Sequence, residues 1–480
     1  MAGLAWAIAA LGRLFVAKCA AVAAGAALGW WWHRKLFVLI VGSPVFHSIG
    51  LGHAGGWLTA GMFLGIGYLV VRRLPPGFTE ATTSLNLVAG FLVGTSAARL
   101  AFSWRPVSEP PRAAAHAALA AADRHPYGPK PDVYLIILDA YTGSGSLARN
   151  RGFDHSPFLD ALRSRGFVIP RSVRANYAHT FLALPGILNW DSVQAVVPDL
   201  PADSQDPKPL VRVIEENPTW WYFARRGYRI AFFPSVRMIT GRNRWASEGF
   251  AEDSNEFLAA WLYMTPAPEV LRGSRALIRL VGGAPSSATR QARMDDRRFV
   301  KLGQLHREGH PVFAFAHFLL PHDPFRFRAD CSYRDSPVWI KLDGSVADSV
   351  IQADYLEQLT CVNRRVLGLV DRIRGGGGGG PEPVIILMSD HGLGMEYRGL
   401  STLEEAPAAS VAERLDAFGA VLVPAPARNA FRGDLTPIGI MRGVMREVFG
   451  LDLPDRREGS WWSSSDRPFD LAPVGAAPAP

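Results

Sequence analysis

Three apolar runs that each end near an acid or an imidazole constrain the fold of this chain more than any other feature. They read "DVYLIILDAY" (132–141), "PVFAFAHFLLPH" (311–322) and "PVIILMSDHG" (383–392). Runs of this length, rich in β-branched and aromatic residues, are typical of strands buried on both faces of a parallel sheet. Because ligands gather at the carboxyl ends of such strands, we expect one site to contain the polar residues found there: Asp139, His317, His322, Asp390 and His391.

Strand-like and helix-like segments alternate from residue 132 onwards. We predict further strands near 167–174, 228–234 and 418–424, and helices near 156–165, 181–189, 210–226 and 349–374. Alternation of this kind indicates an α/β domain with a mostly parallel sheet and helices on both faces. We place this domain at 132–463, and we expect disorder at 464–480 from its composition.

Four apolar stretches precede that domain, at roughly 14–32, 36–52, 55–71 and 84–102. Each is near the length of about 17 to 20 residues that crosses a bilayer. We therefore predict an all-α transmembrane region of about four helices over 1–103, followed by a linker at 104–131. If 36–71 is one interrupted span, the count is three.

The basic residues around these spans predict the orientation of the protein in the membrane. The clusters "HRK" (33–35) and "RR" (72–73) fall on the same side of four spans, and such clusters remain on the cytoplasmic side. The α/β domain is then expected outside the cytoplasm, on a multi-pass protein of the cytoplasmic membrane.

Charge and cysteine content narrow the partners and the compartment further. The formal net charge is +8, but the basic residues are dispersed and form no stripe with interleaved aromatic residues, so we expect no nucleic-acid partner. Cys331 and Cys361 lie in the α/β domain. Outside the cytoplasm they are either a disulfide or two free buried thiols.

Thr180 lies where an irregular stretch becomes an apolar helix, in "RSVRANYAHTFLALPGILN" (171–189). A hydroxyl at this position is commonly an N-cap. It can also be a nucleophile, because a metal lowers the pKa of the hydroxyl and the helix amides favour an anionic phosphoryl group. Both interpretations are open at this stage.

Taken in order, these motifs resemble the alkaline phosphatase superfamily. More narrowly, they resemble its membrane-anchored, sulfatase-like branch of lipoteichoic acid synthases and phosphoethanolamine and phosphoglycerol transferases. The resemblance covers about residues 130 to 425 and rests on five segments, "LIILDAY", "NYAHTFLALPGILN", "HFLLPHDPF", "YLEQLTCVNRRVLGLVDRI" and "SDHG". It implies a sulfatase-like enzyme with a divalent metal, zinc or else manganese, bound by Asp139, Thr180, Asp390 and His391.

The resemblance also implies roles for the side chains around that metal. Thr180 would be the nucleophile. His322, and as a weaker candidate His317, would lie across the site and donate to the leaving group or bind a second metal. For His317, a buried strand histidine with one backbone partner is slightly favoured over a ligand.

The implied activity is transfer of a phosphoryl-linked headgroup from a membrane lipid to an envelope glycan or lipid acceptor. One alternative is a hydrolase of phosphate or sulfate esters that uses water as the acceptor, and another is an inactive membrane scaffold. Two departures bear on these alternatives. "HTFLALP" replaces the C-x-P-x-R-like context of formylglycine sulfatases, which disfavours sulfate-ester hydrolysis. No histidine follows His391, so either one metal suffices, or a residue such as Glu396 supplies a ligand, or activity is lost.

Overall fold

The computed structural model describes residues 130–204, 206–234, 243–249, 287–305, 309–340, 346–376, 380–394, 402–454 and 458–475. The four apolar stretches predicted to cross a membrane, most of the predicted linker, and Glu396 lie outside these residues. Among the helices that are described, none combines the length and the apolar character needed to span a bilayer.

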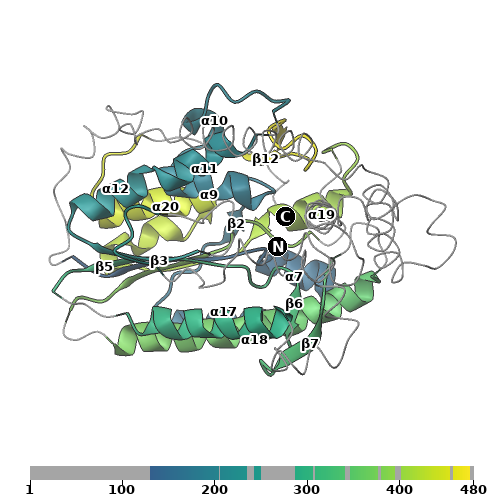
Figure 1. Ribbon diagram of the computed structural model, residues 1–480, viewed down its shortest axis with the longest axis horizontal. Coiled ribbons are helices and arrows are strands. Elements are labelled where there is room, and N and C mark those ends of the chain that lie inside the picture. Colours follow the sequence, from purple (N-terminus) through teal and green to yellow (C-terminus); the bar gives the residue numbers. More distant parts are fainter. Residues whose placement is uncertain are drawn as a thin grey trace, which may run out of the picture. The chain divides into compact units, whose positions relative to one another are not determined.

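A six-stranded sheet lies at the centre of the described domain (Figure 1). Its strand order is β10-β8-β1-β5-β3-β4, and every neighbouring pair is parallel except β10 and β8. The strands are β1 Val133–Leu138, β3 Arg229–Phe233, β4 Glu248–Gly249, β5 Val312–Phe318, β8 Val384–Met388 and β10 Gly419–Leu422. All residues of β1, β5 and β8 are buried. The mostly parallel sheet predicted from the apolar runs is confirmed.

Helices cover both faces of this sheet (Figure 1). One layer contains α9 Thr180–Asn189, α11 Lys208–Glu215, α12 Pro218–Arg225 and α20 Pro437–Gly443, and the other contains α17 Ser287–Gly303 and α18 Asp348–Gly375. Successive strand side chains point to opposite faces. In β1, Val133, Leu135 and Ile137 therefore pack in the α9 layer, while Tyr134, Ile136 and Leu138 pack in the α18 layer.

The structure differs from the sequence-based expectation in three segments. The predicted helix at 210–226 is two helices, because the Asn217 side chain caps α12 and Pro218 cannot continue the preceding helix. The predicted strand at 167–174 is reduced to β2 Ser172–Arg174, in a small sheet with β9 Asp416–Ala417 and β11 Asp434–Leu435.

The third difference concerns residues 464–475, for which the composition predicts disorder. There β13 Ala472–Val474 pairs with β12 Ser460–Trp462, and Phe469 is buried in the α9 layer. The few apolar residues of this segment pack against the folded domain, and local composition alone does not predict such a contact.

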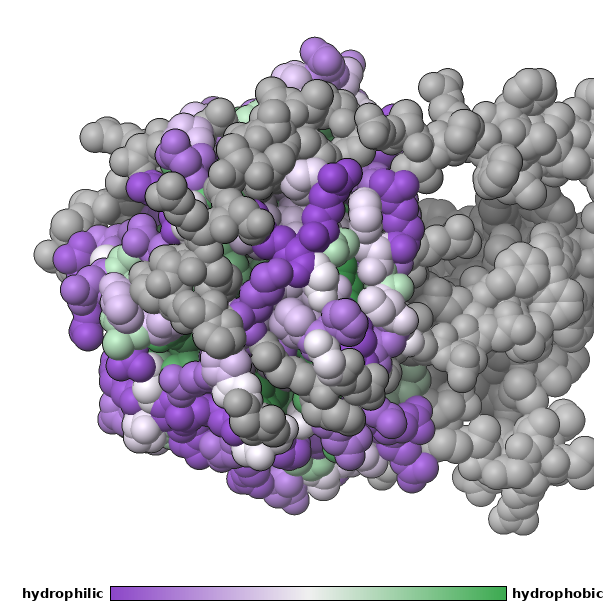
Figure 2. Space-filling view, turned by 90° about the vertical axis from the view of Figure 1, so that its left-hand side faces the viewer, coloured by the Kyte–Doolittle hydropathy of each residue, from purple (hydrophilic) through white to green (hydrophobic). Residues whose placement is uncertain are grey.

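The remaining elements connect the layers. Cys331, in the turn between β6 Phe325–Phe327 and β7 Tyr333–Val338, is joined by a disulfide to Cys361 of α18, which decides between the two alternatives for this pair. Where residues are described, the face at the left of Figure 1 is predominantly hydrophilic (Figure 2). Besides β6 and β7, the elements outside the central sheet and its main helices include α7 Ser144–Arg151, α8 Ser156–Ser164, α10 Val193–Val196, α19 Ala408–Leu415, η1 Ala425–Phe431 and η2 Val444–Val448.

Candidate metal centre

The alternation of side chains along the strands places three candidate ligands on one face of the sheet. The residues that pack toward α9 are the odd-numbered ones in β1 and the even-numbered ones in β8. Asp139 and Asp390 continue these two series just beyond the strand ends. His317 likewise continues the series of Phe313 and Phe315 in β5. All three side chains therefore reach the carboxyl edge of the sheet on the side where α9 begins.

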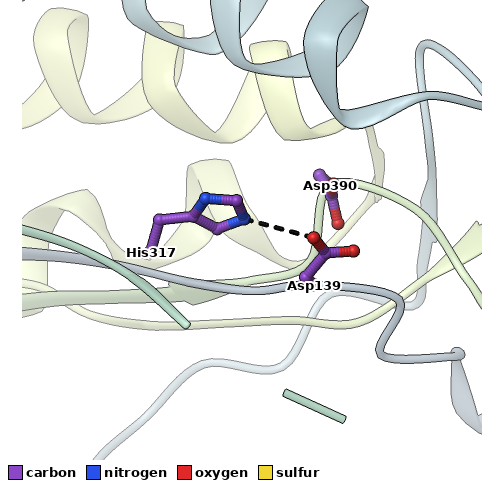
Figure 3. Close-up of side chains that lie close together, drawn as sticks. All are labelled: Asp139, His317 and Asp390. Atoms are coloured by element: carbon purple, nitrogen blue, oxygen red, sulfur yellow. Dashed lines mark ion pairs between the residues drawn. The ribbon is translucent and has the colours of Figure 1, made fainter. Parts of the chain in front are cut away.

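The structure brings these three side chains together (Figure 3). One ligand atom from each of Asp139, His317 and Asp390 lies within 4.8 Å of the others, and all three residues are buried. Nε2 of His317 is 3.5 Å from Oδ2 of Asp139. His317 therefore lies directly beside the two carboxylates. The alternation of side chains in β5 could have indicated this position.

Thr180 is the first residue of α9, and its hydroxyl faces this group. Its Oγ1 atom is 3.1 Å from Nε2 of His391 and 3.5 Å from Oδ2 of Asp139. The N-cap residue of α9 is His179, whose side chain makes no capping hydrogen bond. Thr180 therefore does not serve as the helix N-cap, and its hydroxyl lies against His391 and Asp139 instead.

His391 presents one ring nitrogen to the site. Its Nδ1 lies 3.0 Å from the carbonyl oxygen of Gly392, and a carbonyl can only accept, so Nδ1 carries the proton. Nε2 then has its lone pair directed at the site, 3.2 Å from Oδ2 of Asp390. Burial and the nearby Arg414 guanidinium hold the pKa of His391 well below its usual range. A neutral imidazole with this tautomer is the form that binds metals.

The two carboxyl groups have opposite pKa shifts. Burial and repulsion from Asp139 raise the pKa of Asp390 to about 6. Burial also opposes ionisation of Asp139, but attraction to His322 and a hydrogen bond with His317 outweigh it and hold the pKa of Asp139 below its usual range. Two neighbouring buried carboxyl groups cannot both ionise without a compensating cation.

These residues fit a divalent metal. Oδ1 of Asp139 and Oδ2 of Asp390 are buried carboxylate oxygens that have no hydrogen-bond partner among the described residues, an arrangement that is costly unless a cation satisfies them. Carboxylate oxygens and imidazole nitrogens are ligands of zinc and manganese. The Asp139–His317–Asp390 group, with His391 and Thr180 beside it, supplies such ligands at one point.

His322 lies at the same edge, just after β5. Its backbone N–H donates to the carbonyl oxygen of Asp139, and its Nδ1 is 2.7 Å from the carbonyl oxygen and 3.0 Å from Oδ1 of Asp323. Burial by itself would lower the pKa of His322, but attraction to Asp139 and the contacts with Asp323 raise it to about 9. A protonated His322, about one third exposed, is thus available as a proton donor. Asp323 was not among the residues singled out from the sequence.

The "SDHG" segment is fitted closely to its surroundings. The Ser389 hydroxyl donates to the carbonyl oxygen of Tyr141 and accepts from the N–H of Phe418. These two hydrogen bonds join the end of β8 to the segment after β1 and to the residue before β10. Gly392 has no space for a side chain, because an added Cβ would lie 2.1 Å from the carbonyl oxygen of Glu413 in α19. The serine and the glycine therefore position Asp390 and His391.

Arg414 is a site residue that the motifs did not indicate. It comes from the last turn of α19, and its Nη2 is 3.1 Å from Nε2 of His391. The sequence around it, "VAERLDAF", reads as an ordinary amphipathic helix end, so no local signal marks it.

The fold and the site together define an α/β domain with a buried carboxylate–imidazole group suited to a divalent metal, beside a threonine at a helix N-terminus. No protein-family model matches the chain, and no curated protein sequence matches it. Solved structures do match, and they include the C-terminal periplasmic domain of EcEptC from Escherichia coli, with 12% identity, 74% of this chain and 96% of that chain covered, and a TM-score of 0.45.

Two further matches are enzymes by name. The phosphonate monoester hydrolase of Agrobacterium radiobacter has 16% identity, coverage of 69% of this chain and 80% of its own, and a TM-score of 0.40. The integral membrane lipooligosaccharide phosphoethanolamine transferase A (EptA) from Neisseria meningitidis has 11% identity, coverage of 82% and 70%, and a TM-score of 0.41. Sulfatases are also among the matches.

Proposed function

We propose that this chain is a membrane-anchored, metal-dependent enzyme that uses Thr180 to transfer a phosphoryl-linked headgroup from a phospholipid to an envelope glycan or lipid acceptor. The observation that carries the proposal is the position of the Thr180 hydroxyl. It lies at the first turn of α9, 3.1 Å from Nε2 of His391 and 3.5 Å from a carboxylate oxygen of Asp139. The apolar stretches and basic clusters of the sequence support a cytoplasmic-membrane location with the domain outside.

The proposed metal is zinc, with manganese as the alternative. Asp139, Asp390 and His391 would hold it together with Thr180, and His317 would complete the set or belong to a second metal. When bound, the metal supplies a Lewis acid that lowers the pKa of the Thr180 hydroxyl and withdraws charge from a phosphoryl oxygen.

Thr180 and His322 act in both halves of the proposed reaction. In the first half, Thr180 reacts as the alkoxide: its Oγ1 forms a bond to phosphorus while the bond from phosphorus to the lipid oxygen breaks, and the His322 imidazolium gives its proton to that oxygen. In the second half, an acceptor hydroxyl loses its proton to His322 and attacks phosphorus, and the bond from phosphorus to Oγ1 breaks, so that Thr180 leaves as the alkoxide. The amide groups at the start of α9 favour the anionic phosphoryl group throughout.

Metal content tests the site. Purified full-length protein is compared with an Asp390→Ala, His391→Ala double variant by elemental analysis. We expect zinc or manganese near one per chain in the wild type and its loss in the variant. A wild type that takes up neither metal after reconstitution would contradict the catalytic proposal and favour the scaffold.

Headgroup transfer tests the reaction. The full-length protein is reconstituted in vesicles whose phospholipid carries a labelled headgroup, in the presence of envelope extract as the acceptor. We expect label to move to an acceptor and diacylglycerol to form. If the label appears only as free headgroup phosphate, the same site works as a hydrolase.

A further inference from the structure

Arg414 is a buried arginine beside His391, and three of its hydrogen bonds tie it to the surroundings of the candidate site. Its Nε donates to the carbonyl oxygen of Ala178 at 2.7 Å, and its Nη1 donates to the carbonyl oxygen of Leu393 at 2.8 Å. Its Nη2 lies 3.1 Å from Nε2 of His391. The guanidinium therefore joins the segment leading into the Thr180 helix to the loop that carries the metal ligands.

The loop after His391 packs closely against the backbone and Cβ of Arg414. The N–H of Gly392 donates to the carbonyl oxygen of Arg414 at 2.8 Å. Gly394 has a φ of +58°, and a Cβ there would lie 3.0 Å from Cβ of Arg414. The loop after His391 is thus shaped to place this arginine, and the plane of its guanidinium is fixed by two backbone carbonyls.

The third contact of the guanidinium connects it to the reacting atoms. Nε2 of His391 lies 3.1 Å from Nη2 of Arg414 and 3.1 Å from Oγ1 of Thr180. The Arg414 donor is therefore at most two hydrogen-bond lengths from the proposed nucleophile. A group attacked by Thr180 would place its oxygens within that space.

An imidazole nitrogen has one lone pair, so Nε2 of His391 cannot both bind a metal and accept from Arg414. A metal at Nε2 would release the Nη2 donor, while Nε and Nη1 remain fixed by their carbonyls. We propose that Arg414 is a phosphoryl-binding residue, whose Nη2 then donates to a non-bridging oxygen of the group attacked by Thr180. Guanidinium groups suit this task, because their planar donors match phosphate oxygens and keep their charge. This inference rests on the proposed function of the site.

The proposal predicts opposite changes in two affinities. Without Arg414, the site loses a cation that repels the metal and competes for Nε2, so metal binding tightens. The same variant loses a charge-assisted hydrogen bond to the phosphoryl group, so anion binding weakens by about 10- to 100-fold. A purely structural arginine would behave differently, because its loss would loosen the site and weaken both affinities together.

The experiment measures Zn²⁺ affinity by chelator competition and inorganic phosphate affinity by calorimetry on the zinc-loaded full-length protein. The variants are Arg414→Met, which removes the charge, and Arg414→Lys, which keeps the charge but lacks the planar fork. Arg442→Lys is the matched control. Arg442 is also buried and donates to a backbone carbonyl, that of Trp190, but it belongs to α20, where none of the candidate ligands lies.

We expect Arg414→Met to bind Zn²⁺ at least as tightly as the wild type and to bind phosphate about 10- to 100-fold more weakly. Arg414→Lys should fall between the two in phosphate affinity, and Arg442→Lys should match the wild type in both. Phosphate affinity within about threefold of wild type in Arg414→Met, or parallel loss of both affinities, overturns the proposal.

If Arg414→Met does not fold, Arg414→Lys decides, and an unchanged phosphate affinity in that variant overturns the role. Failure of the proposed function itself is distinguishable, because the wild type would then take up neither Zn²⁺ nor Mn²⁺. That result would overturn both proposals, whereas zinc uptake with unchanged phosphate binding in the Arg414 variants overturns only this one.

Discussion

Replacing Gly392 by alanine tests how the metal-binding loop is fitted against α19. The added Cβ would lie 2.1 Å from the carbonyl oxygen of Glu413 and 2.7 Å from that of Asp416. Real Cβ atoms essentially never approach other heavy atoms closer than 3.0 Å. The loop or the end of α19 must therefore move by at least the difference between 3.0 and 2.1 Å, which is about 0.9 Å.

Neither side of this contact can move at low cost. Glu413 forms a buried ion pair with Arg151, and the Asp416 carboxylate accepts from the N–H of Ser146 at 2.7 Å. Overpacking in such surroundings costs about 1 to 3 kcal/mol, and two backbone clashes favour a value of about 3 kcal/mol. At about 2 to 4 °C per kcal/mol, the Tm should fall by about 6 to 12 °C. A shift of about 1 Å at His391 should also reduce turnover by about a hundredfold.

The assay is thermal unfolding of the full-length protein followed by circular dichroism, with turnover measured on the same samples. Gly375→Ala is the matched control, because a Cβ at this last residue of α18 meets nothing within 4 Å. We expect the control to melt at or slightly above the wild-type temperature. A Tm for Gly392→Ala within about 2 °C of the wild type would refute the packing argument, and wild-type turnover would refute its extension to the site.

Four further predictions follow from the site and its surroundings. Thr180→Ala should lower turnover by at least about a thousandfold while zinc content by elemental analysis stays unchanged, since the carboxylate and imidazole ligands remain; loss of zinc would contradict the expectation that Asp139, Asp390 and His391 hold the metal without Thr180. Because the pKa of Asp390 is raised to about 6, a proton should compete with the metal below that pH, so Zn²⁺ affinity by chelator competition should be level above pH 6 and fall by about tenfold per pH unit below it; a level affinity down to pH 5 would count against this. Because the pKa of His322 is raised to about 9, His322→Asn should slow esters with poor alkoxide leaving groups more than nitrophenyl esters, and equal slowing would argue against a proton donor. The Cys331–Cys361 disulfide closes a separation of 30 residues, so the double serine variant should lose about 3 to 4 kcal/mol in denaturant unfolding, and reductant should destabilise the wild type but not the variant.

The sequence by itself determined the sheet and the edge at which the site lies. The runs that became β1, β5 and β8 are almost wholly apolar, and such runs are stable only when both faces are covered, which indicates central parallel strands. Asp139 and Asp390 follow these runs directly, so the carboxyl edge of the sheet was predictable as the place of a site. The alternation of side chains in β5 also places His317 on the same face of the sheet as the candidate site, although the slightly favoured interpretation made it a buried strand residue.

Only the tertiary structure decided which distant residues complete the site and the domain. Arg414 contacts Ala178, which is 236 residues earlier in the chain, and the ordered pairing of β12 with β13 depends on a surface formed by the rest of the domain. The Cys331–Cys361 pairing likewise required that the turn after β6 reach α18. The physical reason is that hydrophobic periodicity records how deeply a residue is buried and on which face. It does not record which residue from another element lies against it, because that depends on how the helices pack onto the sheet.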